Sequence, residues 1–148
     1  MISRSSDSAS VTRGFTFRTP SPSLATRRFF DGHSWGSEIG NRAALFHGAP
    51  IMSVAWNEAL GRFLLVYAKP FDHEAYARTA PHLEGPWSEE AVLFEIPGES
   101  AYDLNQHAEL EEDGGRVIWL TYSRKTDRGW FGAEHVAWRV ELTRGEGA

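Results

Sequence analysis

The acidic side chains of this sequence fall into two sets according to the turns that carry them. Four carboxylates lie in two short polar turns inside otherwise apolar hairpins: Glu58, Glu111, Glu112 and Asp113. Four others lie in longer connecting segments: Asp72, Glu99, Asp103 and Asp127. Two carboxyl groups about 5 to 10 Å apart can cleave a glycosidic bond, one as the acid and the other as base or nucleophile. Such chemistry depends on which carboxylates the fold brings together.

Residue types that bind metals or activate nucleophiles are sparse. The six histidines include no pair at the spacing of metal ligands such as His-x-x-x-His, and cysteine is absent. The sequence therefore predicts no metal site of the zinc type. It also lacks a Gly-rich phosphate loop and a Ser nucleophile elbow. We expect no cofactor, with calcium at a central axis left open as the alternative.

Two segments of the chain have the same order of features. Residues 53–67 and 107–122 each contain a short strand pattern, a polar turn ending in Gly-Arg, and a long apolar strand that ends near a tyrosine. Gly61 and Gly115 align at an offset of 115 − 61 = 54 residues. Repeats of this length indicate a β-propeller or a similar β array, because one such unit cannot bury its own apolar face.

The alternation of apolar and polar residues predicts an all-β fold of antiparallel four-stranded blades, about two to three blades of a partial β-propeller. A partial blade is expected at residues 11–47, a full blade at 51–97 and an unfinished blade at 106–143. The strands of the full blade are expected at 52–56, 62–69, 74–79 and 91–96. The strands of the last blade are expected at 106–110, 116–124 and 133–142. The nearly unbroken apolar run of 62–69 indicates a strand buried on both faces.

Blade geometry separates the two sets of carboxylates. Strands alternate in direction, so the loops joining strands two and three lie at the same end as those joining strand four to the next strand one. Propeller sites usually lie at this end, and one set of carboxylates falls there: Asp72, Glu99, Asp103 and Asp127. The hairpin set falls at the opposite end, where solvated turn charge explains it. Asp103 is the candidate catalytic carboxylate because it directly precedes an expected first strand. A structural role in a turn is the alternative.

Four residues are candidates for binding a substrate, besides Asp103. His107 opens the expected first strand of the last blade and aligns with Ser53 in the blade before, so both should face the axis. A hydrogen-bonded structural histidine is the alternative for His107. Trp130 and Phe131 lie in an expected loop at the site end, where flat rings either stack on sugars or cap the blade edge. Structural roles are expected for Trp87, Trp119 and Trp138, which should pack between sheets, and for Arg78, which should form an ion pair.

Several short elements occur in the order found in one group of propellers. They are Ser53-Val-Ala-Trp-Asn57, Tyr67-Ala68, Ala77-Arg-Thr-Ala80, Gly85-Pro-Trp-Ser88 and Gln106-His107. From about residue 29 to residue 142 the chain resembles five-bladed β-propeller glycosidase-like proteins. More closely, it resembles a bacterial family formerly of unknown function that includes endo-D-arabinanases. The resemblance implies a carbohydrate-active protein similar to a glycoside hydrolase that acts on arabinan.

The length of the chain limits which properties of the family the resemblance implies for it. A ring of five blades needs about 250 residues, so the resemblance extends only to the C-terminal part of such a protein. In the glycosidase-like relatives, the catalytic carboxylates come mainly from earlier blades. The resemblance therefore assigns no catalytic residue to this chain, and we expect an incomplete set of catalytic carboxylates.

Composition and charge argue against other classes of protein. The chain has 148 residues and a formal net charge of −5, without a basic stripe, which disfavours nucleic acid as a partner. No apolar run approaches the ~20 residues of a membrane span, which disfavours a membrane. Residues 1–10 and 144–148 are expected to be tails, the first disordered. The Ser-rich start lacks the apolar region of a secretory signal. Either the protein is cytoplasmic, or a signal lies upstream in the full gene and the protein is extracellular or in the cell envelope.

Three functions stay open. The first is a glycoside hydrolase-like protein that binds a poly- or oligosaccharide of the arabinan type, with little catalysis expected from this chain alone. The second is a non-catalytic carbohydrate-binding or interaction module. The third is an inert fragment that self-associates through open blade edges, since unpaired strand edges invite association.

Overall fold

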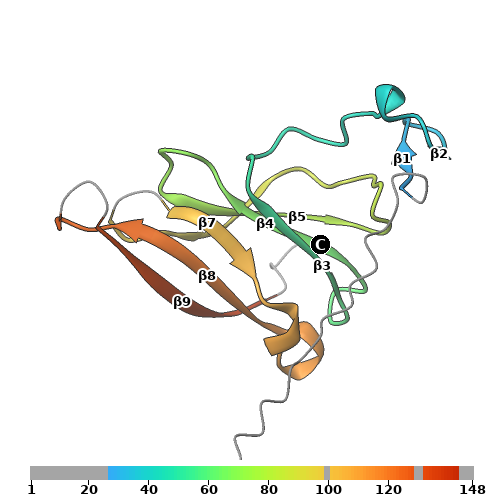
Figure 1. Cartoon of the computed structure of the whole chain (residues 1–148). Coiled ribbons are helices and arrows are strands. Elements are labelled where there is room, and N and C mark those ends of the chain that lie inside the picture. Colours follow the sequence, from blue (N-terminus) through green and yellow to red (C-terminus); the bar gives the residue numbers. More distant parts are fainter. Residues whose placement is uncertain (1–26, 99–100, 129–131, 144–148) are drawn as a thin grey trace, which may run out of the picture.

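The computed structural model describes residues 27–98, 101–128 and 132–143. These residues form an all-β structure of antiparallel sheets with two, four and three strands, and α-helix is absent from the described ranges. Short 3-10 helices connect some of the strands (Figure 1). The expectation of an all-β, antiparallel fold is confirmed.

A small hairpin precedes the two larger sheets. It consists of β1 (Phe29–Phe30) and β2 (Trp35–Gly36), followed by the 3-10 helix η2 (Ile39–Asn41). The turn is held by Asp31, whose Oδ1 accepts hydrogen bonds from the backbone N–H groups of His33 and Ser34 at 2.8 and 2.7 Å. These bonds lower the pKa of the Asp31 carboxyl. Of the expected blade at 11–47, the structure describes only residues 27–47.

The four-stranded sheet matches its expected strands closely. Its strands follow chain order and are β3 (Met52–Asn57), β4 (Arg62–Ala68), β5 (Glu74–Ala80) and β6 (Ala91–Glu95). In the middle of β4, Leu64, Leu65, Val66 and Tyr67 are all at most 2% exposed, so burial of this strand on both faces is confirmed. Gly61 ends the β3–β4 turn with φ 59°, a conformation that favours glycine.

The three-stranded sheet begins earlier than expected. Its strands are β7 (Ala101–Gln106), β8 (Val117–Lys125) and β9 (Ala133–Glu141). The expected first strand at 106–110 is wrong, because η3 (Ala108–Leu110) occupies most of that range. A second 3-10 helix, η4 (Asp113–Gly115), forms the turn before β8. A register shift between Tyr102 and Asn105 interrupts the pairing of β7 with β8 and hides its alternation.

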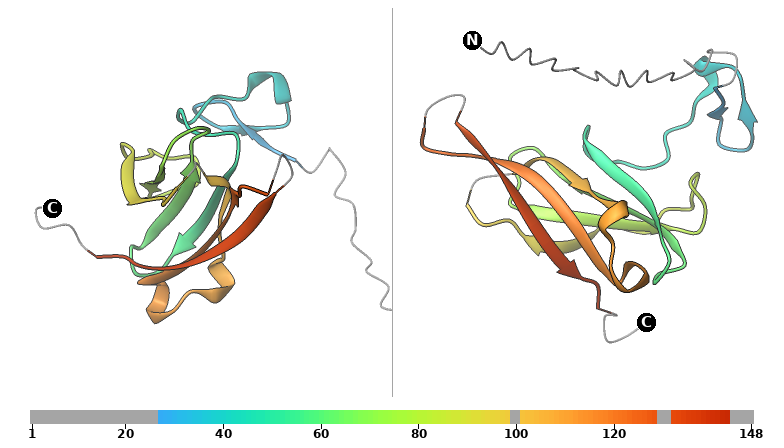
Figure 2. Two further views of the ribbon diagram at one scale, coloured as in Figure 1. Left: turned by 90° about the vertical axis from the view of Figure 1, so that its left-hand side faces the viewer. Right: turned by 60° about the horizontal axis from the view of Figure 1, so that its bottom comes forward.

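The two larger sheets pack face to face around one apolar core (Figures 1 and 2). The core joins residues from both sheets: Leu64, Val66, Ala75 and Ala77 from one, and Ile118, Leu120 and Tyr122 from the other. The rings of Phe94 and Trp138 stack across it at 4.7 Å and 8°. Period-two alternation along β8 and β9 produces this arrangement, because every second side chain points to the same face.

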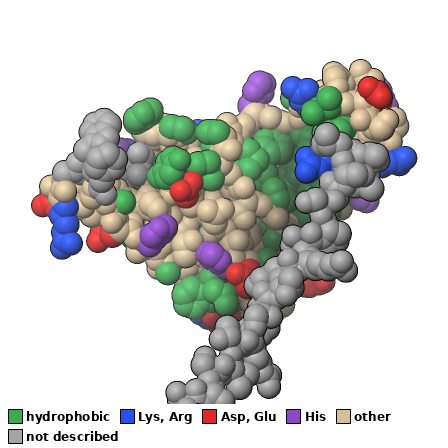
Figure 3. Space-filling model, viewed as in Figure 1, with side chains coloured by type: hydrophobic (Ala, Val, Ile, Leu, Met, Phe, Trp, Pro, Cys, Tyr) green, Lys and Arg blue, Asp and Glu red, His purple; other side chains and the backbone are tan. Residues whose placement is uncertain are grey.

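The opposite face of the four-stranded sheet is only partly covered. Leu65, Tyr67 and Tyr76 are buried there beneath Phe46 and Trp87. Along the edge strand β3, three apolar side chains remain 36–41% exposed: Met52, Val54 and Trp56. Hydrophobic side chains gather in the hollow between β3 and the β1–β2 hairpin (Figure 3).

Candidate functional site

A cavity of about 250 Å³ lies where the β4–β5 loop meets the start of β3 and of β7. We call it the inter-sheet groove. Its lining residues are Pro50, Ile51, Ala68, Pro70, Phe71, Ala101, Tyr102, Asp103 and Leu104. Blade geometry predicts a site at this end of the sheets. The loop that joins the second and third strands of one sheet, β4 and β5, reaches it, and so does the connection from its fourth strand, β6, to the first strand of the next sheet, β7.

Phe71 lies at the tip of a tight turn beside the groove. The N–H of Asp72 donates to the carbonyl of Lys69 at 3.2 Å, which closes a β-turn over residues 69–72. Pro70 takes its second position, and Phe71 takes the third with φ 65°. Type II turns have these features, but their third position normally requires glycine. Phe71 is therefore a strained residue, and its side chain is 93% exposed.

Asp103 reaches the groove from the other sheet. It lies in the register shift of β7, with φ 59°, and the side-chain amide of Asn105 donates to its carbonyl oxygen at 3.0 Å. It therefore lies within β7 rather than before an expected strand. The preceding residue, Tyr102, is 64% exposed and lines the same cavity.

Strain and exposed aromatic surface coincide at this place. Among the described residues, the non-glycine residues with positive φ are Phe71, Asp103 and Asp113, and the first two line the inter-sheet groove. Backbone strain of about 1–3 kcal/mol per residue persists where the surrounding structure enforces it, and it clusters at ligand sites. Chemically, the groove offers two aromatic rings and apolar walls for a flat apolar face, and one carboxylate that can accept hydrogen bonds from hydroxyl groups.

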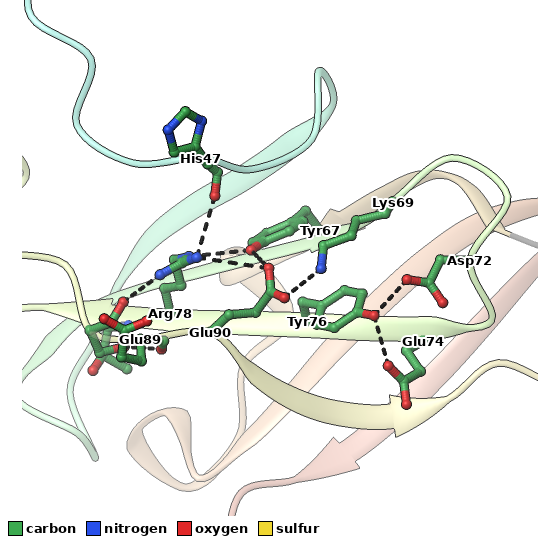
Figure 4. Close-up of polar contacts among 11 residues, drawn as sticks. His47, Tyr67, Lys69, Asp72, Glu74, Tyr76, Arg78, Glu89 and Glu90 are labelled. Atoms are coloured by element: carbon green, nitrogen blue, oxygen red, sulfur yellow. Dashed lines mark hydrogen bonds and ion pairs between the residues drawn. The ribbon is translucent and has the colours of Figure 1, made fainter.

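Charged side chains fix the first residue of the Phe71 turn to the sheet (Figure 4). Lys69 Nζ donates to Glu90 Oε1 at 2.5 Å, and the Tyr67 hydroxyl donates to the other oxygen of Glu90. Arg78 Nε donates to the Tyr67 hydroxyl at 3.2 Å. Burial would raise the pKa of Glu90, but the bonds from Lys69 and Tyr67 hold that pKa below its usual value. Burial, with the bond to Glu90, raises the pKa of Tyr67.

The last residue of the turn is fixed as well. The Tyr76 hydroxyl lies 2.6 Å from Asp72 Oδ2 and 2.7 Å from Glu74 Oε2, so its single hydrogen faces two carboxylates. Both bonds raise the pKa of Tyr76, and the bond to Asp72 has the larger effect. The same bond from Tyr76 lowers the pKa of Asp72. Asp72, expected at the site end, is thus engaged by a tyrosine and is not among the groove residues.

Ser53 and His107 do not line the groove. Ser53 Oγ donates to the carbonyl of Gln106 at 3.3 Å, so β3 and β7 lie beside each other as the repeat predicts. His107 follows the end of β7 instead of opening a first strand. Its Nε2 lies 2.8 Å from Thr121 Oγ1 and its Nδ1 lies 3.3 Å from Glu109 Oε1. Both ring nitrogens therefore have protein partners, which favours the structural alternative for this histidine.

The hairpin carboxylates lie at the end away from the groove, as expected. Glu58 and Asp113 line a separate cavity between the two hairpin turns. Glu112 accepts hydrogen bonds from Arg139 at 2.8 Å and from Trp119 Nε1 at 2.9 Å, and these bonds lower the pKa of Glu112. Two further candidates, Trp130 and Phe131, lie outside the described residues, as does Glu99.

The expected structural roles are only partly confirmed. Arg78 forms an ion pair with Glu90 at 3.8 Å, as predicted. Trp138 packs between the two sheets, whereas Trp87 packs on Phe46 at the opposite face of the four-stranded sheet. The expectation for Trp119 is wrong: its neighbours Ile118 and Leu120 face the core, so Trp119 faces away from it.

Sequence reasoning missed Phe71 and Tyr102. The available signal was weak: an aromatic residue directly after Lys-Pro, and another directly before Asp103. Within the described ranges, no group of three or more His, Asp or Glu side chains could hold a metal ion. None of the helices in those ranges is long and apolar enough to cross a membrane.

Comparison with known proteins gives no assignment. The sequence matches no protein-family model, and no curated protein shows significant similarity to it.

Proposed function

We propose that this chain is a carbohydrate-binding protein whose inter-sheet groove holds an oligo- or polysaccharide of the arabinan type. The observation that carries the proposal is the meeting of Phe71, Tyr102 and Asp103 at one cavity. Sugar rings have apolar faces that stack on aromatic rings, and their hydroxyl groups donate hydrogen bonds to carboxylates. Phe71 and Tyr102 are 93% and 64% exposed as whole residues, which leaves them accessible to such a ligand.

We also propose that the two larger sheets are neighbouring blades of a glycosidase-like β-propeller. Three features support this: strands in chain order within each sheet, face-to-face packing of the sheets, and contact between their first strands through Ser53 and Gln106. In such a propeller, the loops between the second and third strands and the connections from each fourth strand to the next first strand lie at one end. The groove then lies at this end, which is where ligands bind in the proteins that the chain resembles.

Binding is favoured over catalysis for the residues described. Hydrolysis of a glycoside needs a second carboxylate about 5 to 10 Å from the first. Among the described residues that line the groove, Asp103 is the single carboxylate. We therefore expect the chain to bind a saccharide without cleaving it. Release of reducing ends from arabinan by the purified chain would instead favour a glycoside hydrolase.

Affinity electrophoresis in native gels that contain soluble arabinan tests the binding function. We expect the wild-type chain to be retarded, and Phe71→Ala and Tyr102→Ala to migrate as in gels without polysaccharide. Leu83→Ala is the matched control, since Leu83 is an exposed apolar residue (45%) in the β5–β6 connection. The proposal would be contradicted if the wild type migrated equally in gels without polysaccharide, with arabinan and with other polysaccharides.

A further inference from the structure

We propose that Tyr76 and Glu90 are positioning residues, which hold the turn of residues 69–72 so that Phe71 stays at the inter-sheet groove. The identity of the ligand rests on the proposed function, whereas the positioning role rests on contacts within the chain. Both residues lie outside the lining of the groove. They act on it only through the turn.

The turn is fixed at its first and last positions. Lys69, the first residue, is bound through its ammonium group to Glu90, in the segment before β6. Asp72, the last residue, is bound through its carboxylate to the Tyr76 hydroxyl on β5. The two central residues, Pro70 and Phe71, have no such attachment and instead line the groove. The outer positions of the turn thus anchor it, and the inner positions face the ligand space.

The two anchors also contact each other (Figure 4). The Lys69 ammonium lies 3.9 Å from the centroid of the Tyr76 ring, a distance that suits a cation–π interaction. The Tyr76 ring stacks on the Tyr67 ring at 5.7 Å and 26°. Tyr76 is only 6% exposed, so its ring is fixed by packing and can support the turn. One buried tyrosine therefore contacts both ends of the turn.

Such support is needed because Phe71 is strained. An L-residue at φ 65° costs about 1–2 kcal/mol, so a free turn would relax toward negative φ. The Phe71 side chain is almost fully exposed and gains little from packing that could offset this cost. The contacts of Lys69 and Asp72 with the sheet are those that can hold the conformation.

Tyr76→Phe tests the inference, because it keeps the ring and removes the hydroxyl group that bonds to Asp72 and to Glu74. Tyr67→Phe is the matched control: it also removes a tyrosine hydroxyl, here the donor to the second oxygen of Glu90. Neither direct contact with the turn, Lys69–Glu90 or Asp72–Tyr76, involves that hydroxyl. Asp72→Ala removes the same anchor from the side of the turn and replaces Tyr76→Phe if that variant fails to fold. The readout is the ¹⁵N heteronuclear NOE of the Phe71 and Asp72 amides in the free protein, together with arabinan binding.

We expect lower NOE values at both amides in Tyr76→Phe and Asp72→Ala, and unchanged values in Tyr67→Phe. The affinity of Tyr76→Phe and Asp72→Ala for saccharide should be about tenfold weaker, because binding must then order a mobile side chain. Unchanged NOE values in Tyr76→Phe and Asp72→Ala would overturn the inference even if the wild type binds arabinan. Reduced NOE values would uphold the positioning role even if the wild type binds no saccharide, in which case only the proposed function fails.

Discussion

The side chain of Asn57 joins the two larger sheets through Gly115. Asn57 is fully buried, and its Nδ2 donates to the Gly115 carbonyl at 2.7 Å, while its Oδ1 accepts from the N–H of Leu60 at 3.0 Å. This contact links the β3–β4 turn to the turn before β8. It fixes the two hairpins at the end of the sheets opposite to the groove.

Gly115→Ala should destabilise the fold strongly. A Cβ at this position would lie 2.6 Å from Asn57 Nδ2, and Gly115 has φ 89°. We expect the free energy of unfolding to fall by about 2–4 kcal/mol, from overpacking and strain together. Gly114→Ala is the control, because Gly114 also has positive φ (63°) but an added Cβ meets nothing within 4 Å. Chemical denaturation that gives equal losses for both variants would contradict the role of the Asn57 contact.

Ile118→Ala should destabilise both sheets together. Ile118 is fully buried in the core that the two sheets share. Removing such a side chain costs about 2–5 kcal/mol. We expect far-ultraviolet circular dichroism and tryptophan fluorescence to report one shifted transition. Ser123→Ala, on the outer face of β8, should change stability by less than about 0.5 kcal/mol. Two separated transitions would mean that the sheets fold as independent units.

Two substitutions of Phe71 should measure the backbone strain at this residue separately from its part in saccharide binding. Phe71→Ala and Phe71→Asn both remove the ring, but asparagine tolerates positive φ better than alanine. We expect Phe71→Asn to be more stable than Phe71→Ala by about 0.5–1 kcal/mol, and neither variant to be retarded by arabinan. Thermal and chemical unfolding measure the difference. Equal stability of the two variants would indicate that residue 71 does not hold a positive φ in solution.

Acid should release the anchors of the Phe71 turn. The hydrogen bond from Tyr76 lowers the pKa of Asp72 in the folded chain. A lowered pKa stabilises the fold above the ordinary carboxyl value of about 4, and this contribution is lost as the pH falls through the folded pKa. By NMR, we expect Asp72 Cγ in the wild type to titrate below the ordinary carboxyl value, and in Tyr76→Phe to titrate at a higher pH than in the wild type. The same titration midpoint of Asp72 in both proteins would exclude the Tyr76 bond as the cause of the lowered pKa.

Much of the strand arrangement could be predicted because it follows from alternation and turn chemistry. The apolar run before Tyr67 indicates a strand buried on both faces, and Gly61 indicates the end of the hairpin turn before it. The start of β7 could not be predicted, because the strained Asp103 interrupts the alternation of apolar and polar residues. The sequence therefore predicts a strand at 106–110, where the structure has the end of β7 and η3 instead.

The candidate site was located in part. The alternating direction of the expected strands predicts Asp103 at the end of the sheets where the groove lies, although Asp103 lies within β7 and not before a first strand. Phe71 and Tyr102 could not be identified as its neighbours. Phenylalanine rarely adopts positive φ, so nothing in the residues around Phe71 indicates a strained turn. The anchoring of that turn depends on Glu90 and Tyr76, which only the folded sheet brings near Lys69 and Asp72.

Chemical-shift mapping with an arabino-oligosaccharide tests the central claim most directly. Titration of the ¹⁵N-labelled chain should shift the amides of the two loops that form the groove, at Phe71, Tyr102 and Asp103, and should leave those around Asn57 and Gly115 unchanged. Such a pattern would support saccharide binding at the inter-sheet groove. Absence of shifts at millimolar ligand, or shifts confined to other surfaces such as that around His107, would contradict it.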